Sequence, residues 1–173
     1  MVRADTARAS AYLYADAIAG LAGVCHVQRY EGQAAMELEA LVRSPLPAGA
    51  SVAAIVDRGA EVSDLGYTII DNRLDLSPFA ARLIDDRLTP REAAEGFHGA
   101  LIAALGEWIG AEASRSGLNR IALGGGCLMN RVLTEGLFAA LRGQNLQVAI
   151  PRKIPANDGG VSFGQAAFAL NVL

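Results

Sequence analysis

The stretch IALGGGCLMNRVLTEGLFAAL, Ile121–Leu141, decides the fold. It predicts a strand that begins near Asn119, a loop at three successive glycines, and a helix over residues 129–144. Residues 146–151, LQVAIP, predict a second strand, and residues 158–173 predict a closing helix. Because both strands are nearly all apolar and a helix connects them, we expect parallel strands and a sheet covered by helices. The fold class is therefore α/β.

The sequence upstream of this stretch predicts further helices and a small antiparallel set of strands. A capped start is expected at Thr89, Pro90 and Glu92, which open the longest helix. SPLPAG, residues 44–49, breaks the preceding helix and could act as a hinge. The expected helices are 5–22, 31–43, 77–88 and 89–117, the last with the apolar stripe Phe97, Leu101, Leu105, Trp108 and Ile109, and the expected strands are 51–56, 67–71 and 73–78.

Length and composition favour one soluble domain spanning residues 1–173. Apolar residues make up 52% of the chain and charged residues 19%, so we expect an uncovered apolar face and hence a partner or self-association into a homo-oligomer. The net charge of −3 and the pI near 5.4 argue against nucleic acid as a partner. No apolar run has the roughly 20 residues of a membrane helix. The two cysteines, Cys25 and Cys127, fit a reducing cytoplasm and indicate neither a disulfide framework nor a cysteine zinc site.

The three glycines at 124–126 suit an anion. Their backbone amides are uncovered, and the following helix adds a partial positive charge at its N-terminus. A tight turn before a helix explains the same pattern equally well, and the loop lacks both the P-loop lysine and the dinucleotide GxGxxG spacing. Asn130 fits either a ligand contact or a helix cap, and Cys127 is interpreted as a small apolar filler.

A second glycine-rich loop, PANDGG, spans Pro155–Gly160. Asp158 could cap the closing helix or serve as a ligand. Two adjacent glycines suit a place where a ligand or another backbone comes close. Since both loops follow strands of one presumed parallel sheet, we expect them at the same carboxyl edge, where α/β proteins bind ligands.

The other titratable candidates carry a plainer interpretation. Glu37 and Glu39 lie two residues apart and cannot share a helix face. His26 and His98 are the only histidines. We expect His98, which lies near the apolar stripe of the longest helix, to be a core or boundary residue.

The motifs EGQAAMELE (31–39), IALGGGCLMNRVL (121–133) and PRKIPANDGGVSFGQA (151–166), in this order, resemble the carboxy-terminal part of the HypF family. HypF proteins are the carbamoyltransferases of [NiFe]-hydrogenase maturation. The resemblance covers nearly the whole chain. It implies the second lobe of a TsaD-like domain with the ASKHA architecture of actin, Hsp70 and sugar kinases, built on a mixed sheet covered by helices.

The same resemblance implies a nucleotide between two lobes and a divalent metal, whether Fe, Zn or Mg. Asp158 matches the position of the family's metal-binding aspartate. The residues that match nucleotide-binding positions are Gly32, Glu39, Gly125, Gly126, Asn130 and Gly159.

Family members use carbamoyl phosphate and ATP to make carbamoyl adenylate, and then carbamoylate the C-terminal cysteine of HypE. We expect the family's first lobe, with its two metal-binding histidines, and the YrdC-like, zinc and acylphosphatase-like domains to lie outside this chain. A companion chain would then carry the first lobe, and this chain alone would be inactive. The alternatives are a non-catalytic lobe that binds a nucleotide or a partner, and a TsaD-like or O-carbamoyltransferase relative.

Overall fold

The computed structural model describes residues 11–43 and 66–172. The first two helices of the described residues are α1 (Ala11–Leu21) and α2 (Gln33–Arg43), which lie within the predicted helices 5–22 and 31–43. Residues 5–10 of the first predicted helix lie outside the described residues. The predicted hinge at 44–49 and the predicted strand at 51–56 lie outside the described residues.

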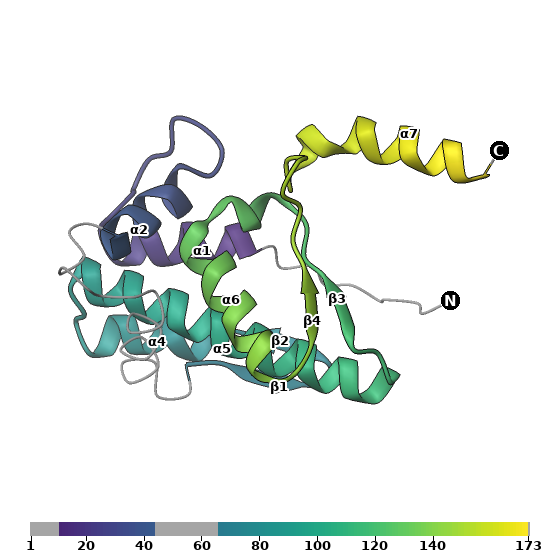
Figure 1. Cartoon of the computed structure of the whole chain (residues 1–173). Coiled ribbons are helices and arrows are strands. Elements are labelled where there is room, and N and C mark those ends of the chain that lie inside the picture. The colour runs from purple at the N-terminus through teal and green to yellow at the C-terminus, as the bar shows by residue number, and fades with distance from the viewer. Residues whose placement is uncertain (1–10, 44–65, 173) are drawn as a thin grey trace.

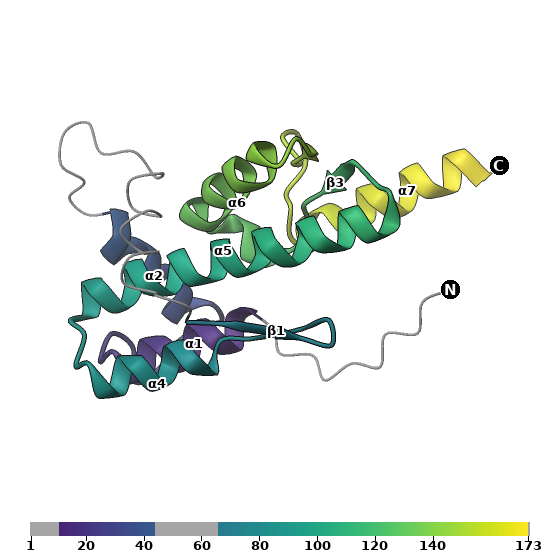
Figure 2. The ribbon, with the colours of Figure 1, turned by 90° about the horizontal axis from the view of Figure 1, so that it is seen from below.

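Helix α5 (Pro90–Ser116) is the longest helix of the described residues, and the other core helices pack against it. The predicted capped start is confirmed, because the Thr89 hydroxyl accepts from the Glu92 amide while the Glu92 carboxylate accepts from the Thr89 amide. Gly117 ends the helix in the left-handed conformation, with φ of 67°. Figure 2 shows α5 running between α1 and α4 (Ser77–Asp85) on one side and α6 (Arg131–Gly143) on the other. Packing on both sides buries nearly every residue from 93 to 104, so this helix is buried more completely than one apolar stripe requires.

The strands form two separate two-stranded sheets in the described residues. Strands β1 (Thr68–Ile70) and β2 (Arg73–Asp75) are antiparallel, as predicted. Asp71 and Asn72 both have positive φ between them, as a two-residue hairpin turn of the primed type requires.

The second sheet, β3 (Arg120–Ala122) and β4 (Gln147–Ala149), is parallel, also as predicted. Helix α6 connects the two strands, after a 3-10 turn at Gly126–Met129. The α/β class is therefore confirmed. The expected covering by helices is met on one face only, because Ile121 and Val148 pack toward Leu137 and Leu141 while the alternate residues of both strands are exposed.

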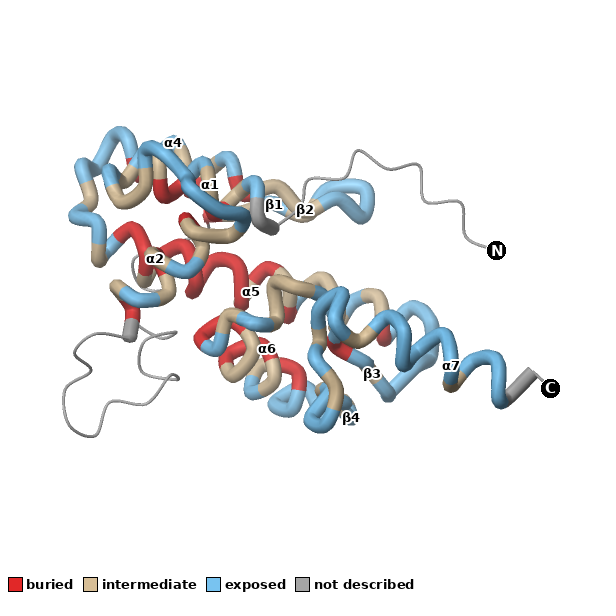
Figure 3. Tube along the Cα trace, turned by 90° about the horizontal axis from the view of Figure 1, so that it is seen from above, coloured by how far each residue is buried: buried red, intermediate tan, exposed pale blue. Residues whose placement is uncertain are grey.

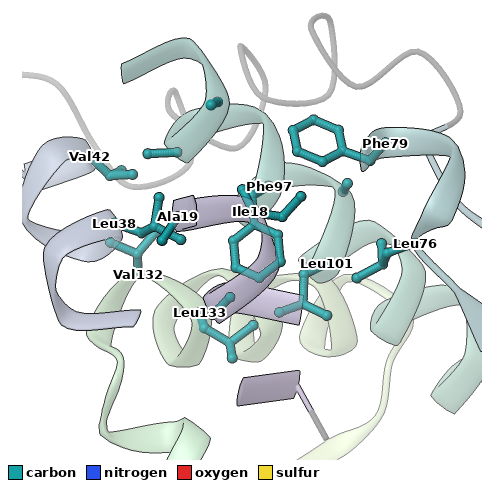
Figure 4. Packing of buried hydrophobic residues seen from close by; sticks show 14 of the residues in the cluster. Ile18, Ala19, Leu38, Val42, Leu76, Phe79, Phe97, Leu101, Val132 and Leu133 are labelled. Carbon is teal, nitrogen blue, oxygen red and sulfur yellow. The ribbon is translucent and has the colours of Figure 1, made fainter. Parts of the chain in front are cut away.

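The main core lies where α1, α2, α4, α5 and the first turn of α6 meet. Figure 4 shows Val132 and Leu133 of α6 beside Leu38 of α2 and Leu101 of α5. Val132 and Leu133 are 1% and 4% exposed, and burying each stabilises the fold by about 2 kcal/mol. The start of α6 is thus fixed to the body of the molecule. Figure 3 shows that buried residues concentrate in these helices.

Helix α7 (Val161–Val172) follows a 3-10 turn at Asp158–Gly160 and extends away from the body (Figure 1). Between Val161 and Leu170 every residue except Ala167 is exposed, although the helix carries no charged side chain. The expected uncovered apolar face is therefore found on α7. Its largest exposed side chains are Val161, Phe163, Phe168 and Leu170.

Candidate functional site

The two glycine-rich loops meet at the carboxyl edge of the parallel sheet. The Leu123 amide donates to the Ala149 carbonyl oxygen at 2.9 Å, which extends the pairing of β3 and β4 by one step. Beyond it, the Gly125 amide donates to the carbonyl oxygen of Ala156 at 2.7 Å. This bond joins the first loop directly to the second, so the predicted meeting of the two loops is confirmed.

The conformation of the first loop explains one of its glycines. Gly125 has φ of 113° and ψ of 162°, a region that residues with a side chain rarely adopt. A Cβ on Gly124 or Gly125 would meet no atom within 4 Å, so both positions face open space. Because the Gly125 amide is already bonded to Ala156, the anion donors that remain are the amides of Gly124 and Gly126, which have no backbone partner within the described residues.

In the second loop the cap is Asn157 and not Asp158. The Asn157 side-chain oxygen accepts from the Gly159 amide at 3.1 Å and caps the 3-10 turn Asp158–Gly160. Asn157 takes this role because its backbone is extended, with φ of −89° and ψ of −168°, as a capping residue requires. Asp158 is exposed, and its carboxylate makes no hydrogen bond or ion pair with the described residues. The interpretation of Asp158 as a helix cap is therefore wrong.

The glycine pair of the second loop serves the chain's own backbone. A Cβ on Gly160 would lie 2.6 Å from the Pro155 carbonyl oxygen, and one on Gly159 would lie 3.2 Å from the Asn157 side-chain oxygen. Contacts under 3.0 Å force a shift of the chain. Of the two reasons expected for paired glycines, the close approach of another backbone holds at Gly160.

Two side chains from different parts of the sequence secure the N-terminus of α6. The Asn130 side-chain oxygen accepts from the Leu133 amide at 2.9 Å. Glu39 of α2 accepts from the Arg131 amide at 3.1 Å. Together they satisfy two of the amides that a helix start leaves unpaired, and they place Glu39 and Asn130 at the end of the first glycine loop. Glu37 faces elsewhere and accepts from the Gln33 side chain at 2.7 Å, as the different helix faces predict.

His98 lies beneath this junction. It is 1% exposed and is the one buried polar or charged residue in the described part of the chain, so its interpretation as a core residue is confirmed. Its Nδ1 lies 2.8 Å from the Ala94 carbonyl oxygen, and its Nε2 lies 2.9 Å from the amide nitrogen of Asn130. Burial lowers the pKa of His98, opposed by the Ala94 carbonyl and by the charge of Glu39. Sequence reasoning missed the contact with Asn130, because no local pattern links residues 32 positions apart.

Two other predicted residues stand as follows. Cys127 is half-buried and packs against the main core, which confirms its role as an apolar filler. Gly32 has φ of 79°, and its carbonyl oxygen accepts from the Met36 amide of α2 at 3.1 Å. It lines an open depression of about 660 Å³ with residues that include Asp16 and Tyr30. No residue of either glycine loop lines this depression, so the depression does not bring Gly32 together with the glycine-loop candidates.

The described residues do not by themselves fit a metal ion. They contain no group of three His, Cys, Asp or Glu side chains close enough to hold one, and Asp158 stands alone in its loop. A single carboxylate leaves a divalent cation short of protein ligands. In the same described residues, no helix is both long and apolar enough to cross a membrane.

Residues 12–165 match the family model described as "Carbamoyltransferase, Kae1-like Domain, second subdomain". The chain is 46% identical over 159 residues to the carbamoyltransferase HypF of Rhizobium leguminosarum bv. viciae. This alignment covers 91% of this chain and 19% of that protein. It is also 38% identical over 162 residues to a HypF homolog of Cupriavidus necator, in an alignment that covers 91% of this chain and 39% of that protein.

Two solved structures share the fold. A crystal structure of full-length HypF in the phosphate- and nucleotide-bound form matches with a TM-score of 0.72 and 27% identity, over 94% of this chain and 20% of that one. The crystal structure of HypF from T. kodakarensis matches with a TM-score of 0.65 and 20% identity, over 88% of this chain and 19% of that one. The chain thus spans about a fifth of the length of most of these relatives. It belongs to the HypF carbamoyltransferase family, in which it corresponds to the second subdomain of the Kae1-like domain.

Proposed function

We propose that this chain forms the second, nucleotide-facing lobe of a cytoplasmic HypF-type carbamoyltransferase. Such an enzyme uses carbamoyl phosphate and ATP to make carbamoyl adenylate, and it transfers the carbamoyl group to the C-terminal cysteine of a HypE-like acceptor for the cyanide ligands of [NiFe] hydrogenase. The observation that carries the proposal is the bond between Gly125 and Ala156, which brings both glycine loops to one edge of the sheet. Membership of the HypF family supports it, as does the relative whose structure is described as phosphate- and nucleotide-bound.

In this proposal the first loop binds the phosphates. The amides of Gly124 and Gly126 point the loop's partial positive charge at the anion, and the N-terminus of α6 adds to it. Asn130 holds that N-terminus and offers its remaining amide hydrogen to the ligand. Glu39 acts mainly on the protein side, because its carboxylate bonds the Arg131 amide. Binding and orientation of the nucleotide are the tasks of these residues.

The remaining proposed ligand positions lie further out. Gly159 borders the nucleotide from the second loop, and Gly32 borders the adenosine from the start of α2. Asp158 contributes one carboxylate toward a divalent metal, either Fe, Zn or Mg, whose other ligands come from the companion lobe. The described residues support no step that runs through such a metal, so the chain alone transfers no carbamoyl group.

The exposed helix α7 supports the need for a companion lobe. Phe163 and Phe168 are 59% and 71% exposed on a helix without charge, and exposed apolar faces of this kind mark association surfaces. A second candidate function, a non-catalytic lobe that binds a nucleotide or a partner, is favoured by the isolation of Asp158. The two functions differ in whether Asp158→Ala changes ATP affinity in the presence of Mg²⁺.

Titration calorimetry of the chain with ATP, with and without Mg²⁺, tests the proposal. Gly125→Ala is the informative variant and Gly117→Ala is its matched control. Both glycines have positive φ, and a Cβ on either would meet no atom within 4 Å. Alanine adopts the left-handed conformation of Gly117 at a cost of about 1 kcal/mol, whereas the conformation of Gly125 costs about 1 to 3 kcal/mol. Only Gly125 lies in the loop.

We expect Gly125→Ala to weaken ATP binding about tenfold, which is about 1.4 kcal/mol, and Gly117→Ala to leave it unchanged. Equal effects of both substitutions would show that the loop is no binding site. Absence of ATP binding to the chain would contradict the proposed nucleotide site and favour a non-catalytic lobe that binds a partner. ATP binding that Asp158→Ala leaves unchanged would favour a non-catalytic lobe that binds a nucleotide.

A further inference from the structure

We infer that His98 is the positioning residue for Asn130: its unprotonated Nε2 fixes the side-chain amide of Asn130, and through it the glycine loop and the start of α6. His98 itself touches no ligand. The inference deepens the proposed function and rests on it wherever a nucleotide is involved. Its geometric part, the hydrogen-bonded chain from Ala94 to Leu133, stands independently of any ligand.

Two backbone groups determine the donor and the acceptor of each hydrogen bond between Ala94 and Leu133. At one end the Ala94 carbonyl oxygen can only accept, so Nδ1 of His98 must carry the proton. At the other end the Leu133 amide can only donate, so the side-chain oxygen of Asn130 must face it. The amide nitrogen of Asn130 then faces Nε2 of His98, which accepts. Both side chains are thereby held in one orientation.

Burial raises the free-energy cost of losing either hydrogen bond of His98. His98 is 1% exposed, and an imidazole without partners at such a position carries the full cost of desolvation. The groups that face it come from three elements: the Ala94 carbonyl of α5, the Asn130 amide before α6, and the charge of Glu39 on α2. A proton on Nε2 would set two donors against each other and turn the Asn130 amide, so that the Leu133 amide would lose its acceptor.

The position of Asn130 carries the effect into the first loop. The backbone amide of Asn130 donates to the Cys127 carbonyl oxygen at 3.1 Å, and the backbone carbonyl oxygen of Asn130 accepts from the Thr134 amide at 3.0 Å. Asn130 therefore joins the 3-10 turn that begins at Gly126 to the first turn of α6. A side chain that fixes Asn130 fixes the geometry in which the loop amides meet an anion.

The first test needs no ligand. In the nitrogen-15 spectrum of the wild-type chain at pH 7.5, His98 should be protonated at Nδ1 and unprotonated at Nε2, and the Asn130 side-chain amide protons should exchange slowly. His98→Gln places an acceptor near the position of Nε2 and should keep the slow exchange. His98→Asn places its donor near Nδ1, keeps the Ala94 bond and should lose the slow exchange. The opposite tautomer, a charged imidazole, or equal behaviour of the two variants overturns the inference.

The second test uses ATP with Mg²⁺ as the probe. We expect His98→Asn to weaken binding about tenfold and His98→Gln to stay within about twofold of wild type. Asn130→Ser keeps a capping side chain that is too short to reach His98, and should lose at least as much affinity as His98→Asn, because it also removes the amide that Asn130 offers to the ligand. Because His98 acts through Asn130, the double variant should lose no more than Asn130→Ser alone.

The outcomes separate the two proposals. Full additivity of the His98→Asn and Asn130→Ser losses, or wild-type affinity in His98→Asn, overturns the positioning role. If the wild-type chain binds no ATP, the proposed function fails, and the positioning role is then decided by the nitrogen-15 spectra alone.

Discussion

Replacing Asn130 with alanine removes two interactions that the structure places on one side chain. The Leu133 amide loses its acceptor, which costs about 1 kcal/mol for a helix cap. Nε2 of the buried His98 loses its donor, which costs a further 1 to 3 kcal/mol, roughly, for an unsatisfied buried group. We therefore expect Asn130→Ala to lower the free energy of unfolding by about 2 to 4 kcal/mol.

Asn157→Ala is the matched control, because Asn157 is also a capping asparagine. It is exposed, its turn is only three residues long, and its side-chain oxygen accepts from the Gly159 amide. We expect it to cost about 0.5 kcal/mol, the low end for a cap. Equilibrium urea unfolding of the 173-residue chain, read as a midpoint shift at constant slope, gives both values. If the two substitutions cost the same within about 0.5 kcal/mol, the reasoning about His98 and Asn130 is refuted.

Three further predictions concern the second loop, the long helix and pH. Gly160→Ala should destabilise the chain by about 1 to 3 kcal/mol, because its Cβ would lie 2.6 Å from the Pro155 carbonyl oxygen. Gly164→Ala on the exposed helix α7 should be neutral or stabilising by up to about 1 kcal/mol. Thermal unfolding measures the stability of both variants, and a less stable Gly164→Ala than Gly160→Ala would contradict the prediction. Thr89→Ala should cost about 1 kcal/mol through loss of the capping box of α5, and an unchanged urea midpoint would count against it. Burial lowers the pKa of His98 below its ordinary value near 6.5, so below that pH the unfolded chain binds a proton that the folded chain does not. The stability that this group contributes is therefore complete above about pH 6.5 and is lost as the pH falls below it. Urea midpoints from pH 7.5 to 5.5 should drop further for wild type than for His98→Gln, and parallel curves would refute the assignment.

The features that the sequence predicts correctly are those with a local cause. The order of strand, glycine loop, helix and strand predicts parallel pairing of β3 and β4, and parallel pairing brings both loops to one edge. Thr89 and Glu92 predict the start of α5 because a capping box is three residues long. The hairpin between β1 and β2 also has a local cause, because Asp71 and Asn72 both tolerate positive φ.

The features that it misses depend on packing between distant segments. Glu39 bonds the Arg131 amide 92 residues away, and His98 meets Asn130 only because α5 and α6 pack together. Between Asn157 and Asp158 both side chains can cap, and only the backbone angles of the loop select Asn157. The uncovered apolar face is expected from the composition of the whole chain, and only the structure locates it on α7, where the described residues are mostly exposed.

The central claim is that this chain supplies the second lobe of a HypF-type carbamoyltransferase. It is tested most directly by replacing the 159-residue segment of the Rhizobium leguminosarum HypF that aligns with this chain by the corresponding part of this chain. The account predicts that the chimera transfers a carbamoyl group from carbamoyl phosphate, with ATP, to the terminal cysteine of a HypE-like acceptor, detected by mass spectrometry. It predicts that Asp158→Asn abolishes this transfer without lowering the unfolding temperature. A folded chimera that transfers nothing, or one in which Asp158→Asn keeps full transfer, would contradict it.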